Sequence, residues 1–438
     1  MIKKRAIFLL AFLLIFSAAS AYALQIGGDS NVEIHGFITQ GYLGSTDNNF
    51  FGETSDGGTF HFNERGINFA SDVSDRLHIG VQFFSRDFGE LGNNEVTIDW
   101  AYADYSIVEA FNLKAGKVKL PHGLYNTGRD VDMLRNSILL PQSVYNESWR
   151  DAANALNGLD TYGYLYAGGA GSFEYHLLGG VSNLKDDGAE VRLLEDQQAY
   201  WMDMDVKSAD TEYTVAASVI WESPLDGLRL GVNGWIVDWD SPTEINKSPT
   251  EKEKIDTSFG VRLKTWATSV EYSIGNLIFA AEYNRINYDL SLPISSVSNS
   301  SIPDIAKNFD AEGYYGSLTY RFTDWFEVGT YYSEYYSDRS DKDGKERRAV
   351  WDASNGTGGG FPPGQEHRAY LKDLALAIRF DITENWIFKL EGHKMEGGAI
   401  MLNSDGNIGS YDTLTGKGSG PLYEEDWYLY AAKVSFSF

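Results

Sequence analysis

The last twelve residues of the chain, 427–438, read WYLYAAKVSFSF. One set of alternate positions is apolar or aromatic throughout: Tyr428, Tyr430, Ala432, Val434, Phe436 and Phe438. Polar residues stand between the last of them: Lys433, Ser435 and Ser437. Because successive side chains of a β-strand point to opposite faces, this alternation predicts a strand with one apolar face and one more polar face.

The same alternation recurs along the rest of the chain in stretches of about ten residues that are joined by turns containing Gly, Pro or Asp. Together with the stretches 32–42 and 427–438, these hairpins predict about sixteen strands. The predicted hairpins pair 60–69 with 77–86, 96–107 with 113–120, 159–166 with 173–181, 213–221 with 228–237, 259–272 with 277–287, 314–322 with 326–335, and 374–380 with 386–394.

Short turns alternate with long polar connections, and this regularity separates the sequence from a soluble β-sandwich or propeller. The long connections are 183–210, 238–256, 291–310, 337–372 and 397–425. In lipid every backbone polar group must find a partner, so strands can span a membrane only as a closed barrel. We therefore expect an all-β fold, a transmembrane antiparallel barrel with short periplasmic turns and long extracellular loops.

The N-terminus has the order of a secretory signal peptide. Lys3, Lys4 and Arg5 precede the apolar run 6–16, and small residues follow up to Ala23. Because the apolar run is too short for a comfortable membrane span, cleavage after Ala23 is expected rather than a retained anchor helix. Residues 24–438 would then form a single barrel domain, and no later stretch has the length of a transmembrane helix.

Composition narrows the partners and the chemistry. The chain has no cysteine, and its formal net charge of −26 becomes −29 when residues 1–23 are removed with their three cations. Such a protein has no disulfide framework and does not seek nucleic acid. The seven histidines show no metal-ligand spacing, and the glycine cluster 356–360 lacks the strand-to-helix context of a phosphate loop. No cofactor, metal site or catalytic residue is therefore expected.

The final aromatic strand with its C-terminal Phe438 resembles the sorting signal of Gram-negative outer-membrane proteins. That resemblance implies recognition by the barrel-assembly machinery and insertion among outer-membrane lipid and lipopolysaccharide. Trp325, Trp386 and Trp427 stand near predicted strand ends, where aromatic girdles meet the membrane interfaces.

One connection, 121–157, differs from the others because it contains apolar segments at 137–141 and 144–145 and a predicted short helix at 147–156. Its place after the fifth strand resembles the third external loop of sixteen-stranded porins, which folds into the lumen and narrows it. The run 116–126, GKVKLPHGLYN, with Arg129-Asp130, Arg135, 137–141 and Tyr145, is also similar to the phosphate-selective and dicarboxylate-type porins. The resemblance implies a homotrimer and a pore-constricting role for 121–157.

Charges of both signs lie on this loop, and in a narrow channel with low-dielectric walls they would create a strong local field. An equally open interpretation is that they pair with one another and with the wall to hold the loop in place. The candidates for constriction and selectivity are Arg129, Asp130, Asp132, Arg135, Glu147, Arg150 and Asp151.

Alternation also predicts which charged residues of the strands face the lumen. The predicted lumenal cations are Arg86, Lys117, Lys119, Arg262, Lys264, Arg379, Lys389 and Lys433. The same rule places Glu33, Asp99, Glu174, Glu282 and Glu391 there, so the predicted interior is mixed in charge rather than basic.

These features predict an outer-membrane porin, a water-filled channel for passive diffusion of small hydrophilic solutes and ions. The alternative is a substrate-specific channel for phosphate or dicarboxylate with its binding site at Arg129, Arg135, Lys117 and Lys119. An outer-membrane barrel enzyme is a third interpretation, although the chain lacks a distinctive nucleophile motif.

Overall fold

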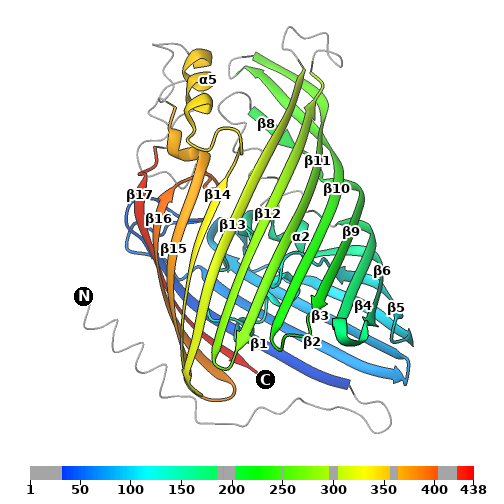
Figure 1. The fold of residues 1–438 in the computed structure, drawn as a ribbon. Helices are drawn as coiled ribbons and strands as arrows, with labels where there is room; N and C mark the ends of the chain where they lie inside the picture. The colour runs from blue at the N-terminus through cyan, green and yellow to red at the C-terminus, as the bar shows by residue number, and fades with distance from the viewer. Residues whose placement is uncertain are drawn as a thin grey trace.

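The structure is a computed structural model that describes residues 32–182, 184, 191, 203–248, 251–294, 304–355, 364–402 and 422–438. The expected signal peptide, residues 1–23, lies outside this part of the chain. Within it, one antiparallel sheet curls into a closed barrel of sixteen strands, and a short additional strand, β8 (Asp203–Val206), pairs with β10 above the barrel (Figure 1).

Every predicted strand is present, which confirms the predicted fold class. The barrel strands are β1 (Val32–Ser45), β2 (Phe62–Ser74), β3 (Leu77–Phe88), β4 (Thr97–Val108), β5 (Phe111–Lys119), β6 (Ala155–Tyr166), β7 (Ser172–Ser182), β9 (Asp210–Glu222), β10 (Leu228–Ser248), β11 (Glu251–Ile274), β12 (Leu277–Leu292), β13 (Ile305–Thr323), β14 (Phe326–Tyr336), β15 (Tyr370–Asp381), β16 (Trp386–Gly397) and β17 (Asp426–Ser437).

The two ends of the sheet meet, so the barrel has no free edge. Strand β1 pairs with β17, with Phe37 opposite Ser437. Gly36 and Phe438 exchange two backbone hydrogen bonds of 3.0 Å, and the Phe438 ring covers the face of Gly36, where a Cβ atom would lie 2.7 Å from the ring. Closure pairs the backbone groups that lipid could not satisfy.

The alternation in β17 divides lipid from lumen as predicted. Tyr428 and Tyr430 are 55% and 43% exposed on the outer face, whereas Trp427 and Lys433 are fully buried inside the barrel. A polar side chain can be buried at Lys433 because carboxylates inside the lumen meet it.

The tallest strands stand together on one side of the barrel. Strands β10 and β11 remain paired as far as Ser248 opposite Glu251, so most of the connection expected at 238–256 is strand (Figure 1). The expectation of a long loop there was wrong because Trp239, Ser241, Thr243 and Ile245 continue the inward alternation on β10. This wall rises beyond the shorter strands β4, β5 and β6 (Figure 1).

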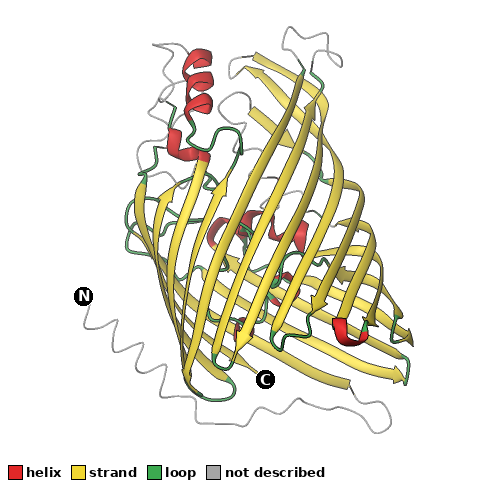
Figure 2. Ribbon diagram, viewed as in Figure 1, coloured by secondary structure: helices red, strands yellow, loops and turns green. Residues whose placement is uncertain are grey.

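Helices are few and small in the described part of the chain. One helix, α5 (Lys345–Asn355), lies in the connection between β14 and β15, and several short turns lie inside the barrel (Figure 2). None of the described helices has both the length and the apolar character needed to cross a membrane.

Candidate pore constriction

The connection between β5 and β6 folds into the lumen, and we refer to its residues 120–154 as the L3 loop (Figure 2). It contains four short helical turns: η2 (Asn126–Gly128), η3 (Asp132–Leu134), η4 (Glu147–Trp149) and α2 (Arg150–Asn154). The side chain of Asn146 caps η4 by accepting a 2.8 Å hydrogen bond from the Ser148 N–H group. The helix predicted at 147–156 thus ends slightly earlier, where β6 begins.

Four of the candidate charged residues meet the wall near β3 and β5. The Glu147 carboxylate lies 2.7 Å from Arg129 and 2.9 Å from Arg86 of β3. Asp130 pairs with Arg150 and with Lys119 of β5. This group of alternating charges ties both ends of the L3 loop to the same side of the barrel.

A second group of charges ties the middle of the loop to β16 and β17. One oxygen of Asp132 lies 3.1 Å from Lys389 Nζ and 3.4 Å from Lys433 Nζ, and its other oxygen accepts a 2.7 Å hydrogen bond from Ser435. Arg135 lies 3.6 Å from the same carboxylate. Because this site is buried, the charges are compensated by one another rather than by water.

Side chains of the barrel wall also form hydrogen bonds with the backbone of the L3 loop. The sequence pattern did not predict these contacts. Glu391 accepts hydrogen bonds of 2.6 and 2.9 Å from the N–H groups of Ile138 and Leu139. Arg379 donates to the carbonyl oxygens of Met133 and Arg135 at 2.6 and 3.1 Å. The sequence pattern predicted that Glu391 points inward, but it did not show that the L3 backbone would be its partner.

Strand β12 provides a further anchor at the beginning of the loop. Glu282 accepts a 2.8 Å hydrogen bond from the Leu124 N–H group and further hydrogen bonds from the hydroxyls of Tyr145 and Tyr315. His122 is fixed nearby, because it lies 3.0 Å from the Val144 carbonyl oxygen and accepts from Trp235 of β10. The loop is therefore bonded to walls on opposite sides of the lumen.

Burial and pairing set the protonation of the loop. Burial alone would raise the pKa of Glu147, but the adjacent Arg129 and Arg86 lower it to about 2. Burial likewise opposes ionisation of Asp130 and Asp132, yet the cations around each hold its pKa well below the usual range. All of these carboxylates are ionised at neutral pH and paired with cations.

The candidate residues differ in how far they reach the lumenal water. The side chains of Arg129, Asp130, Asp132 and Arg150 are at most 4% exposed, whereas Asp151 is 28% exposed. Arg135 and Glu147 lie between these values. The structure therefore gives the predicted charges extensive pairing contacts and leaves Asp151 the most accessible of them.

The predicted lumenal cations fall into two groups. Most of them contact the L3 loop: Arg86, Lys119, Arg379, Lys389 and Lys433. Lys117 donates a 2.6 Å hydrogen bond to the Ile98 carbonyl oxygen of β4. The prediction for Arg262 and Lys264 was wrong.

On β11 the inward positions are apolar. Val261 and Leu263 are buried inside, while Arg262 pairs with Asp238 and Lys264 lies 3.2 Å from Asp289 on the outer face. Apolar residues point inward there because the lumen beside them is filled with protein rather than water.

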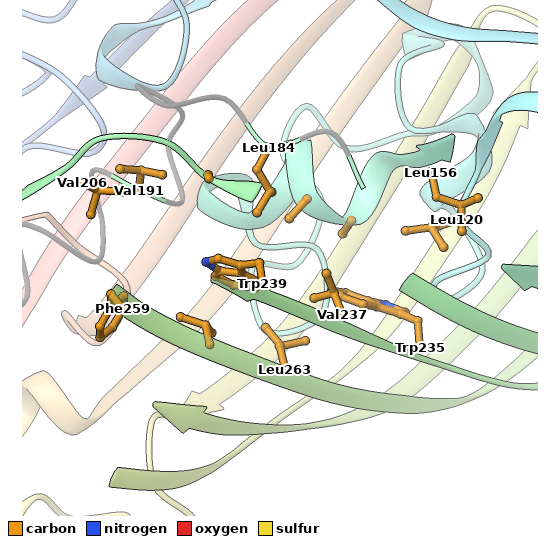
Figure 3. Close-up of a cluster of buried hydrophobic side chains, with 14 of the residues drawn as sticks. Leu120, Leu156, Leu184, Val191, Val206, Trp235, Val237, Trp239, Phe259 and Leu263 are labelled. Carbon is orange, nitrogen blue, oxygen red and sulfur yellow. The ribbon is translucent and has the colours of Figure 1, made fainter. Parts of the chain in front are cut away.

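Two apolar clusters fill the lumen at the level of the L3 loop. The first includes Trp235, Val237 and Trp239 of β10, which lie close to Leu120, Leu156 and Leu184 in Figure 3. The second joins L3 residues Ile138 and Leu139 to side chains of β1–β3 and β13–β17. Trp149, Ile286 and Tyr288 pack against both clusters. The interior at the loop is thus largely apolar core, with charged residues embedded in it.

Comparison with known proteins shows which fold this is. Matching chains include OmpF from Salmonella typhi in complex with daunomycin (13% identity, TM-score 0.53, covering 95% of this chain and 100% of that chain). They also include an anion-selective porin from Comamonas acidovorans (12%, 0.51, 94% and 100%) and the trimer form of OmpT from Vibrio cholerae (10%, 0.51, 93% and 99%).

No family model matches the chain, and no curated protein matches it either. The likeness to these solved structures shows that the chain has the fold of the outer-membrane porins, as the resemblance in its sequence implied. No cluster of side chains suited to hold a metal ion occurs among the described residues.

Proposed function

We propose that this chain is a channel of the outer membrane through which small hydrophilic solutes and ions diffuse, and that the L3 loop is its constriction. The observation that carries the proposal is the L3 loop itself, which lies inside a closed barrel and is bonded to β3 and β5 at its ends and to β16 and β17 at its middle. A loop held in this way narrows the lumen without requiring a catalytic group.

The constriction would act through the seven charged residues of the loop: Arg129, Asp130, Asp132, Arg135, Glu147, Arg150 and Asp151. Because most of them are already paired, an incoming anion would have to compete with protein carboxylates for Arg129 and Arg135. This pairing favours a channel of modest ion preference over a site specific for phosphate or dicarboxylate.

The test is conductance in a planar lipid bilayer with detergent-purified, folded protein. We expect stepwise current in KCl, and millimolar phosphate or succinate should leave that current unblocked. Protein denatured by heat before addition is the matched control. An absence of steps from folded protein would refute the channel, and strong block by phosphate or succinate would favour the anion-specific alternative.

The proposed partners follow from the same function. We expect outer-membrane lipid and lipopolysaccharide around the exposed aromatic face and the barrel-assembly machinery at the Phe438 strand. A homotrimer is supported by the neighbour described as the trimer form of OmpT. Light scattering of the detergent-extracted protein tests it, and a monomer mass would contradict it.

A further inference from the structure

The apolar core at the L3 loop has a gap beside β4. Neither apolar cluster has a buried member from β4 within the described ranges, although the half-buried Tyr102 packs against the first. The β4 residue that points into the lumen there is Asp99, which is buried and accepts hydrogen bonds from Gln82 and Asn154. A hydrophilic solute that crosses the core would therefore meet the least apolar route along this strand.

A cavity of about 590 Å³ occupies that gap, between β4 and the end of the L3 loop. This volume lies within the range of pockets that hold small molecules. Phe84, Leu91 and Ile98 form its apolar part. Its charged lining consists of three cations and three carboxylates: Arg86, Lys117, Arg150, Glu95, Asp99 and Asp151.

Two buried polar atoms in the cavity lining have no hydrogen-bond partner in the described part of the chain. One is Nη2 of Arg86, a donor, and the other is Oδ1 of Asn154, an acceptor. Both residues are more than nine-tenths buried. Arg86 Nη2 lies 3.6 Å from Asp151, beyond the distance of a direct charge-assisted hydrogen bond. Buried polar atoms are normally paired, so the lining lacks both an acceptor and a donor.

From this arrangement we infer that the cavity binds small zwitterionic solutes of the amino-acid type, an inference that rests on the proposed channel function. The carboxylate of the solute would lie at Arg86 and Lys117. Its ammonium group would lie at Asp151 and at the side-chain amide oxygen of Asn154. Apolar lining receives a short aliphatic side chain. A simple anion satisfies the cations but faces three carboxylates, so a solute with both charges complements the lining better.

The experiment compares leucine with two matched probes, each lacking one charge. The first is 4-methylpentanoate, which is leucine without its amino group, and the second is 3-methylbutylamine, which is leucine without its carboxylate. Binding to detergent-solubilised protein is measured by calorimetry, and the KCl current is recorded in parallel. We expect leucine to bind about tenfold or more tightly than either probe.

Substitutions assign the two charges to the two sides of the cavity. Asp151→Asn should weaken leucine about tenfold and leave 4-methylpentanoate unchanged, whereas Lys117→Gln should weaken both and leave 3-methylbutylamine unchanged. Glu53→Gln, at an exposed position outside the cavity, is the control and should change nothing.

Equal affinity for leucine and 4-methylpentanoate would overturn the inference in favour of an anion site. No leucine binding by a protein that conducts KCl would overturn it while the channel stands. Leucine binding with the expected preference by a protein that does not conduct would support the cavity and refute the channel.

Discussion

Replacing Asp132 with asparagine removes the negative charge on which the centre of the L3 loop is anchored. The Asp132 carboxylate faces Lys389, Lys433 and Arg135, and neither lysine side chain is more than 1% exposed. Lys433 keeps a second carboxylate, Glu64, at 2.7 Å. Lys389 keeps two carbonyl oxygens, from Asp132 and Ser137, and loses its carboxylate neighbour.

A buried charge left without its partner costs about 3–5 kcal/mol, so Asp132→Asn should lower the free energy of unfolding by about that amount. Unfolding by urea in detergent, followed by the gel shift between folded and denatured barrel, measures the change. The freed loop should also give a noisier and larger single-channel current. Asp132→Asn combined with Lys389→Met should recover part of the lost stability, because it removes the uncompensated charge.

The matched control is Asp343→Asn, which breaks an exposed ion pair with Lys345 and should leave stability unchanged. The reasoning would be refuted if Asp132→Asn unfolded at the same urea concentration as the unaltered protein. It would also be refuted if the double variant lost more free energy of unfolding than the two single variants lose together.

Three further outcomes are expected. Deletion of Phe438 removes the two hydrogen bonds to Gly36 that help to close the barrel, so folded, heat-modifiable protein in the outer membrane should fall severalfold, and normal levels would contradict this. Arg129→Ala should shift the reversal potential toward cations and Glu147→Gln toward anions, because each breaks the same buried pair from the opposite side; shifts of one sign would contradict it. The lowered pKa of Glu147 stabilises the fold fully above its ordinary value of 4.5, and this stability is lost as pH falls toward about 2; Glu147→Gln should abolish that part of the acid transition in urea unfolding curves.

The strands could be predicted because successive side chains of a barrel strand face lipid and lumen in turn. In β17 this alternation assigned Tyr428 and Tyr430 to the outside and Lys433 to the inside correctly. The same rule failed on β11, because it assumed that the polar side chains of a strand face the lumen. Val261 and Leu263 face inward because the L3 loop and other connections fill that side, and the charges of Arg262 and Lys264 go outward to Asp238 and Asp289.

The unusual composition of residues 121–157 was enough to single out the loop inside the barrel, since an exposed tip needs no apolar segments. Its charged residues were all found there, but their roles could not be separated. In the sequence, Arg129 and Asp151 are both simply charged residues of the same loop. Only their surroundings in the fold bury Arg129 against its partner and leave Asp151 partly accessible.

The sequence by itself determined the class of fold, because a repeat of two residues is a local property that the lipid-facing and lumenal environments impose on every strand. Only the tertiary structure decided which charges meet. Lys389 donates to the backbone of a residue 257 positions away, and Ser435 bonds to Asp132 across 303 positions. Barrel closure brings β16 and β17 to the loop that follows β5, and no local pattern carries that information. The gap beside β4 has the same origin, since it is the part of the lumen that the packed loop leaves unfilled.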